Sequence, residues 1–258
     1  MSEDPYAVKP WLEHYDEGVP PHIVYPEINL YEILDNSAKD FGNNTAIWFQ
    51  KRKISYKEFK DIADRLATAL HELGVKKGDT VAIMIPNFPQ FLFSFYGILK
   101  AGGIVTACSV LLTEPELAYQ LNDSGAETII AWDAQLEKIN NIKDRTRLRN
   151  IIITSVMDYI PNAPRDPPEI SGTMQFLNLI SKTKPNPPQF TIDPKTQVAV
   201  LQYTGGTSGL PKGAMLTHRK QHSDQIRNVA TVKKIPLAYC VDAFSQELPV
   251  WRWYALAV

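Results

Sequence analysis

Residues 54–103 read ISYKEFKDIADRLATALHELGVKKGDTVAIMIPNFPQFLFSFYGILKAGG, and their hydrophobic pattern changes from helical to extended and back. In the first part, between residues 57 and 73, apolar side chains recur at steps of three, one and three and share one helical face. They are Phe59, Ile62, Ala63, Leu66, Ala69, Leu70 and Leu73. Gly74 ends this helix, and the turn KKGD leads into a buried strand over residues 81–85. A second helix follows and ends at Gly102 and Gly103.

Part of this stretch, residues 80–99, has no charged side chain over about the length that a bilayer span needs. Two prolines and two amides interrupt it, namely Pro86, Asn87, Pro89 and Gln90. Proline breaks a helix in its interior, so we expect a strand and a separate helix here instead of a transmembrane segment.

Further βα units follow downstream. A strand over residues 104–108 precedes a helix that begins at a capping box of Thr113 and Glu116, has Pro115 in its first turn and ends at Gly125. Apolar strands at residues 127–132 and 150–156 flank a charged stretch. The chain therefore predicts an α/β fold of stacked βα units, with a mostly parallel sheet covered on both faces.

Prolines suggest the domain organisation. Between residues 161 and 194 lie 8 of the 19 prolines, which predicts an extended connection without regular elements. We therefore expect a first α/β subdomain with an N-terminal leader over residues 1–160, this connection over 161–194, and the start of a second α/β subdomain over 195–258. A buried strand at residues 197–203 opens that second part.

Composition excludes several classes of function. The net charge of -1, from 27 basic and 28 acidic residues, gives no electrostatic reason to expect nucleic-acid binding. Cys108 and Cys240 lie far apart without metal-binding spacing, and the N-terminus carries acidic residues where a secretory signal needs basic ones. We expect a cytoplasmic protein. His218 and His222 lack a third ligand nearby, so we expect no metal site.

Residues 203–218 read YTGGTSGLPKGAMLTH and follow the last predicted strand directly. Glycines in such a loop let main-chain N–H groups converge on an anion, hydroxyl side chains add donors, and a lysine adds a full positive charge. The glycines are Gly205, Gly206 and Gly209, the hydroxyl residues are Thr204, Thr207 and Ser208, and the lysine is Lys212. This composition predicts a phosphate-binding loop.

The loop is not a Walker A motif, because Pro211 precedes Lys212 and Gly213 follows it, and the chain has no GxGxxG pattern. A flexible surface turn is the alternative. The fixed order of glycine, hydroxyl, proline and lysine favours the phosphate-binding interpretation.

This motif resembles the phosphate-binding signature of the acyl-adenylate-forming superfamily, the AMP-dependent synthetases and ligases. Residues 54–103 and 112–131 are similar to the N-terminal region of those enzymes. Residues 9–23, KPWLEHYDEGVPPHI, resemble the leader of prokaryotic long-chain fatty acid–CoA ligases.

The resemblance implies a two-step reaction. A carboxylate attacks the α-phosphorus of ATP to give an acyl-adenylate and pyrophosphate, and the thiol of coenzyme A then displaces AMP. Mg²⁺ would bridge the phosphates, residues 204–212 would hold the β and γ groups, and Lys212 would be catalytic. A long-chain fatty acid is the preferred substrate, and an aryl acid such as coumarate is the alternative.

Residues 248–256, LPVWRWYAL, resemble the family segment that lines the acyl and adenylate pocket, with Arg252 at the family's histidine position. Trp251, Trp253 and Tyr254 would wall this pocket, although an aromatic core segment is the alternative. Arginine puts a permanent cation where a titratable imidazole is expected.

By resemblance, the chain covers only the N-terminal part of the family's large domain and lacks the later adenine, magnesium and adenylation motifs. Two hypotheses follow: a ligase fragment without full activity, or a non-catalytic product that at most binds nucleotide. A partial domain would leave sheet edges and apolar faces exposed, so we expect self-association or a separate C-terminal chain to cover them. Peripheral contact with a membrane is a further possibility.

Overall fold

The computed structural model describes residues 9–15, 27–163, 170–204 and 210–221. Its strands are β1 (Thr45–Phe49), β2 (Arg52–Ser55), β3 (Thr80–Met84), β4 (Ile104–Ala107), β5 (Thr128–Trp132), β6 (Asn150–Thr154), β7 (Met174–Gln175), β8 (Val198–Thr204) and β9 (Lys212–Thr217). Its α-helices are α1 (Glu32–Phe41), α2 (Tyr56–Glu72), α3 (Pro89–Lys100), α4 (Glu114–Ser124), α5 (Leu136–Ile142) and α6 (Phe176–Lys182). Short 3-10 helices are η1 (Pro10–His14), η2 (Asp133–Gln135), η3 (Lys143–Arg145) and η4 (Val156–Tyr159).

The main sheet has seven strands in the order β7-β6-β5-β3-β4-β8-β9. Every neighbouring pair in it is parallel except β8 and β9, which are antiparallel. β1 and β2 form a separate antiparallel pair. The predicted mostly parallel α/β sheet is confirmed.

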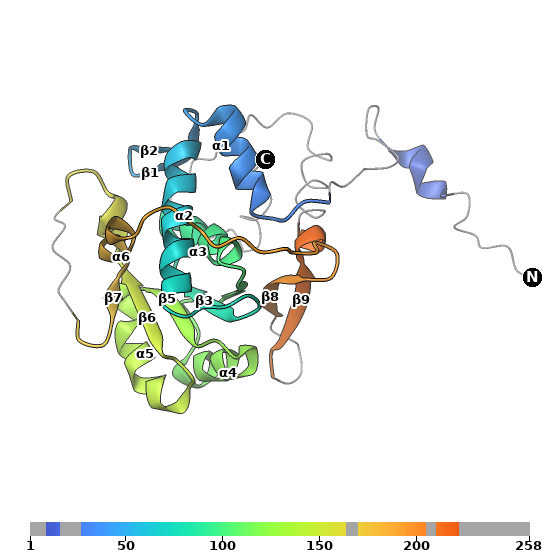
Figure 1. The fold of residues 1–258 in the computed structure, drawn as a ribbon. Coiled ribbons are helices and arrows are strands. Elements are labelled where there is room, and N and C mark those ends of the chain that lie inside the picture. Colours follow the sequence, from blue (N-terminus) through green and yellow to red (C-terminus); the bar gives the residue numbers. More distant parts are fainter. Residues whose placement is uncertain (1–8, 16–26, 164–169, 205–209, 222–258) are drawn as a thin grey trace, which may run out of the picture.

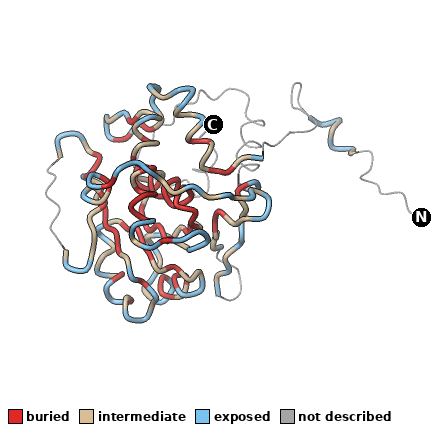
Figure 2. Tube along the Cα trace, in the orientation of Figure 1, coloured by how far each residue is buried: buried red, intermediate tan, exposed pale blue. Residues whose placement is uncertain are grey.

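Helices cover both faces of this sheet, with α2 and α3 on one side and α4 and α5 on the other (Figure 1). The strands alternate between two cores accordingly. Val81 and Ile83 of β3 belong to the core beneath α2 and α3, whereas Ala82 and Met84 belong to the core beneath α4 and α5. This period of two is the pattern of a strand buried on both faces, and Figure 2 shows the buried residues concentrated in these layers.

The uncharged window at residues 80–99 contains β3 and most of α3, as predicted, with the Pro86–Asn87 loop between them. Both elements are buried in the sheet and in the helix layer. Among the described helices, none has the length and apolarity to cross a bilayer.

α4 begins and ends where its sequence predicts. The Glu116 carboxylate accepts a hydrogen bond from the backbone N–H of Thr113 at 2.8 Å, which completes the capping box. At the other end, Gly125 adopts the left-handed conformation with φ of 69°. This helix is therefore fixed at both termini.

The expected extended connection over residues 161–194 is wrong in one respect, because it contains β7 and α6. Phe176 and Ile180 of α6 are buried in the core with α2 and α3, so tertiary packing gives this proline-rich region a helix. β8, from the expected second subdomain, pairs with β4 of the first. The division into 1–160, 161–194 and 195–258 stays a prediction.

α2 and α3 pack closely in the helix layer. A methyl group at Gly97 of α3 would come within 2.8 Å of Leu66 Cδ2 of α2, so the missing side chain allows the approach. One turn later, Lys100 Nζ lies 2.5 Å from Asp35 Oδ1 of α1 and 2.6 Å from Asp64 Oδ1 of α2. One buried ammonium thus joins three helices, and burial of such a charge requires this pairing.

His218 ties the end of β9 to the segment before α1. The backbone N–H of Leu30 donates to His218 Nδ1 at 3.2 Å, and the His218 residue is 2% exposed. Burial lowers the pKa of this imidazole to about 4, below its ordinary value of 6.5. At neutral pH the ring is therefore neutral and carries its proton on Nε2.

Replacing Lys100 with alanine should lower the free energy of unfolding by about 3 kcal/mol, because the Asp64 carboxylate is left buried without its buried cation. Lys60→Ala is the matched control. Lys60 Nζ lies 2.5 Å from the other Asp64 oxygen, but its side chain is 36% exposed, so we expect a loss below about 1 kcal/mol. Urea unfolding measures both, and equal losses would contradict the central role of Lys100.

Acid should destabilise the protein through His218. The unfolded chain binds a proton at this histidine below about pH 6.5 and the folded chain only below about pH 4, so its contribution to stability is complete above pH 6.5 and lost as the pH falls towards 4. His218→Asn keeps an acceptor for Leu30 without titrating. Relative to this variant, the wild type should lose about 3 kcal/mol of unfolding free energy across that window. Parallel pH profiles for the two proteins would overturn this expectation.

Candidate functional site

The predicted phosphate-binding loop joins β8 to β9. Thr204 is the last residue of β8, Lys212 is the first of β9, and the two are cross-strand partners. Their Cβ atoms are therefore about 5 Å apart on one face of the hairpin. Both residues are exposed. A hydroxyl donor and an ammonium group thus stand together at the point where the glycine-rich segment leaves and re-enters the sheet.

The parallel strands place this hairpin end at the carboxyl edge of the sheet. β8 runs parallel to β4, and β4 to β3, so Thr204 lies on the same edge as the ends of those strands. Ligands of open α/β sheets bind at this edge. The position is therefore suitable for an anionic substrate.

Tyr203 packs across the hairpin beside Lys212. Its partner in the register is Gly213, where an added Cβ would meet Tyr203 Cζ at 3.0 Å, so the ring lies against the glycine backbone. The Tyr203 hydroxyl donates to Asp123 Oδ2 of α4 at 2.5 Å. Burial and this hydrogen bond raise the pKa of Tyr203 well above its ordinary value, so it remains a donor at neutral pH.

A second contact from α4 reaches the other side of Lys212. The Tyr119 hydroxyl donates to the backbone carbonyl of Pro211 at 3.0 Å. Tyr119 and Asp123 are four residues apart and therefore share one face of α4. Lys212 is thus bracketed by Pro211 and Gly213, and both neighbours are connected to the same helix face.

Of the predicted site residues, the structure brings Thr204 and Lys212 together. The other predicted loop residues, Gly205, Gly206, Thr207, Ser208 and Gly209, lie outside the described residues, as do the predicted pocket residues Trp251, Arg252, Trp253 and Tyr254. His222 also lies outside them. His218 Nδ1 accepts a hydrogen bond from the backbone N–H of Leu30.

Cys108 is not a candidate nucleophile. It is buried, and burial raises the pKa of its thiol to about 12, so the thiolate is not formed at neutral pH. Within the described ranges, there is no group of three or more His, Cys, Asp or Glu side chains arranged to hold a metal ion.

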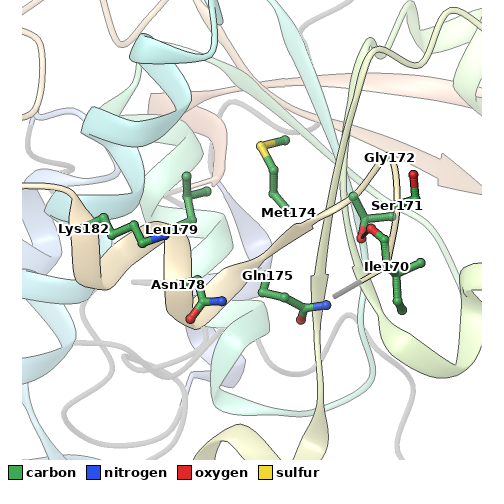
Figure 3. Close-up of a pocket in the computed structure, with 9 residues that line it drawn as sticks. Ile170, Ser171, Gly172, Met174, Gln175, Asn178, Leu179 and Lys182 are labelled. Carbon is green, nitrogen blue, oxygen red and sulfur yellow. Dashed lines mark hydrogen bonds between the residues drawn. The ribbon is translucent and has the colours of Figure 1, made fainter. Parts of the chain in front are cut away.

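A cavity of about 570 Å³ lies at the opposite end of the sheet order from the hairpin. Figure 3 shows that the turn before β7, β7 itself and α6 line it, with Met174, Asn178 and Lys182 among the lining residues. Neither Thr204 nor Lys212, the predicted site residues that the structure describes, lines it. The hairpin remains the candidate site.

The sequence did not indicate the roles of Tyr119 and Asp123. Their spacing of four residues on a capped helix marks them as neighbours on one helix face. Their partners at Tyr203 and Pro211 lie 80 and 92 positions further along the chain. Only the packing of α4 against β4 and β8 reveals this contact.

Residues 34–251 match the model of a protein family described as AMP-binding enzyme. A long-chain-fatty-acid–CoA ligase of Bacillus subtilis (strain 168) is 39% identical over 225 residues, covering 82% of this chain and 40% of that protein. A 4-coumarate–CoA ligase of Arabidopsis thaliana is 34% identical over 169 residues, covering 65% of this chain and 28% of that protein.

Among solved structures, a long-chain-fatty-acid–CoA ligase from Archaeoglobus fulgidus superimposes with a TM-score of 0.72 and 24% identity, over 86% of this chain and 43% of that chain. This likeness supports the fold. The chain spans less than half the length of each of these three proteins.

The Tyr203–Gly213 contact predicts the effect of adding one methyl group. Gly213→Ala should displace the Tyr203 ring and lower the free energy of unfolding by about 1 kcal/mol, because the new Cβ would lie 3.0 Å from Cζ and 3.1 Å from Cε2. The same substitution in a Tyr203→Ala background should cost nothing. Thermal or urea unfolding of the four proteins gives the coupling energy, and additive effects would rule out the contact.

Proposed function

Because the chain belongs to the family of AMP-binding enzymes, we propose that it carries the ATP-gripping part of an AMP-forming acyl-CoA ligase. In this reaction a carboxylate oxygen attacks the α-phosphorus of ATP, the bond to the β-phosphate oxygen breaks, and pyrophosphate leaves. The thiol of coenzyme A then attacks the acyl carbon of the adenylate, and AMP leaves. The thiol proton is released as the thioester forms.

The observation that carries this proposal is the pairing of Thr204 with Lys212 across the two ends of the glycine-rich segment. The exposed Lys212 ammonium suits the β- and γ-phosphate oxygens, where negative charge increases as pyrophosphate leaves. Thr204 adds a hydroxyl donor. Backbone N–H groups and hydroxyls of Gly205, Gly206, Thr207, Ser208 and Gly209 complete the proposed grip.

A long-chain fatty acid is the proposed acyl substrate. The long-chain-fatty-acid–CoA ligase of Bacillus subtilis matches 82% of this chain, whereas the 4-coumarate–CoA ligase of Arabidopsis matches 65% at lower identity. Trp251, Trp253 and Tyr254 are proposed to line the acyl pocket together with Arg252. An aryl acid is the competing substrate.

Coenzyme A is the proposed acyl acceptor, and Mg²⁺ would accompany ATP. The described residues offer no cluster of acidic, histidine or cysteine ligands for that ion. Near the hairpin, the Asp123 carboxylate already accepts a hydrogen bond from Tyr203. Magnesium binding, a cytoplasmic location and self-association stay predictions.

Lys212→Ala should weaken ATP binding by this chain at least tenfold, because it removes the only full positive charge in the glycine-rich motif. Isothermal titration with ATP and magnesium measures the affinity. Lys57→Ala, which removes an exposed lysine from α2, is the matched control and should bind as the wild type does. Equal ATP affinities of the wild type and Lys212→Ala would contradict the proposal that Lys212 binds the phosphates of ATP.

Exchange of labelled pyrophosphate into ATP tests the chemistry and the substrate. We expect exchange to depend on a long-chain fatty acid, with coumarate less effective. Exchange driven best by coumarate would favour the aryl-acid alternative. ATP binding without exchange would favour the hypothesis of a chain that binds nucleotide but does not complete adenylation.

A further inference from the structure

α4 contacts the β8–β9 hairpin on both sides of Lys212. The Tyr119 hydroxyl donates to the carbonyl of Pro211 at 3.0 Å, directly before Lys212. The Tyr203 hydroxyl donates to Asp123, and its ring lies on Gly213, directly after Lys212. Two independent contacts from one helix face therefore constrain the backbone that carries this lysine.

The helix that makes these contacts is itself fixed. Leu117 and Leu121 are fully buried in the core beneath α4 and α5. Gln120 Nε2 donates to Thr106 Oγ1 at 3.1 Å and to the carbonyl of Ala107 at 3.0 Å, which attaches α4 to β4. Thr106 Oγ1 in turn donates to the carbonyl of Leu201 of β8 at 3.2 Å. α4, β4 and β8 form one hydrogen-bonded unit.

Lys212, in contrast, has an exposed side chain for which no hydrogen bond or ion pair occurs among the described residues. A long, exposed lysine side chain loses rotamer entropy when a ligand fixes it, and an unconstrained backbone beneath it would add to that loss. If the backbone is already fixed in the free protein, less conformational entropy is lost when the ligand binds.

We propose that Tyr119 and Asp123 are positioning residues, which hold Pro211 and Gly213 and thereby aim Lys212 at the phosphates of ATP. This proposal rests on the ATP grip proposed above. Neither side chain touches the nucleotide; each acts through the hairpin backbone. Their removal should loosen the hairpin and weaken the binding of ATP without unfolding the protein.

Hydrogen–deuterium exchange of the whole chain without nucleotide tests the structural claim that Tyr119 and Asp123 hold the hairpin backbone. Tyr119→Phe removes one hydroxyl, and Asp123→Ala removes the acceptor for Tyr203. In each variant, backbone amides of residues 212–217 should exchange at least about fivefold faster, in line with the loss of one hydrogen bond. Asn122→Ala is the matched control, because Asn122 of the same helix donates to the carbonyl of Arg145 instead. Unchanged exchange in both test variants would overturn the proposal.

Titration with ATP and magnesium tests the functional half. Tyr119→Phe and Asp123→Ala should each raise the dissociation constant about fivefold in a protein that stays folded and still unfolds cooperatively. Asp123→Asn, which keeps an acceptor, should bind ATP as the wild type does. If Lys212→Ala loses affinity while both test variants bind as the wild type does, the positioning role is wrong and the ATP grip stands. If the wild type binds no ATP, the proposed grip fails, and the exchange experiment still decides whether α4 holds the hairpin.

Discussion

The parallel pairing of β8 with β4 is the constraint on which the arrangement of the candidate site depends. It is short, with Val105 opposite Val200 and Thr106 opposite Leu201. It nevertheless fixes the direction of β8, and so places Thr204 at the edge where the other parallel strands end. With the opposite direction, the glycine-rich segment would leave the sheet at its amino edge, away from the usual ligand position of an open α/β sheet.

The two helix layers support this sheet by different means. On one side, Gly97 allows α3 to approach α2, and the buried Lys100 ammonium joins Asp35 and Asp64. On the other side, the apolar face of α4 is buried in the core, and its polar residues Tyr119 and Asp123 bond to Pro211 and to Tyr203 of β8. The same helix thus covers one core and bonds to the candidate site. The packing of this core therefore helps to determine the position of Lys212.

Local signals predicted much of this structure. The repeat of apolar residues indicated α2, and the capping box of Thr113 and Glu116 indicated the start of α4. The anion-binding role of the glycines and Lys212 stays a prediction. Signals of this kind act within a few residues. The helix α6 inside a proline-rich region depends on burial of Phe176 and Ile180. The contacts of Tyr119 and Asp123 join residues that are 80 or more positions apart, and a single sequence does not reveal such pairs.

A crystal structure of this chain with ATP bound is the most direct test of the central claim that the β8–β9 hairpin grips the nucleotide's phosphates. We expect β- or γ-phosphate oxygens within about 3 Å of Lys212 Nζ and Thr204 Oγ1, with Tyr119 still bonded to Pro211 and Tyr203 to Asp123. ATP bound elsewhere, for example in the cavity beside β7, with Lys212 facing solvent, would contradict this claim.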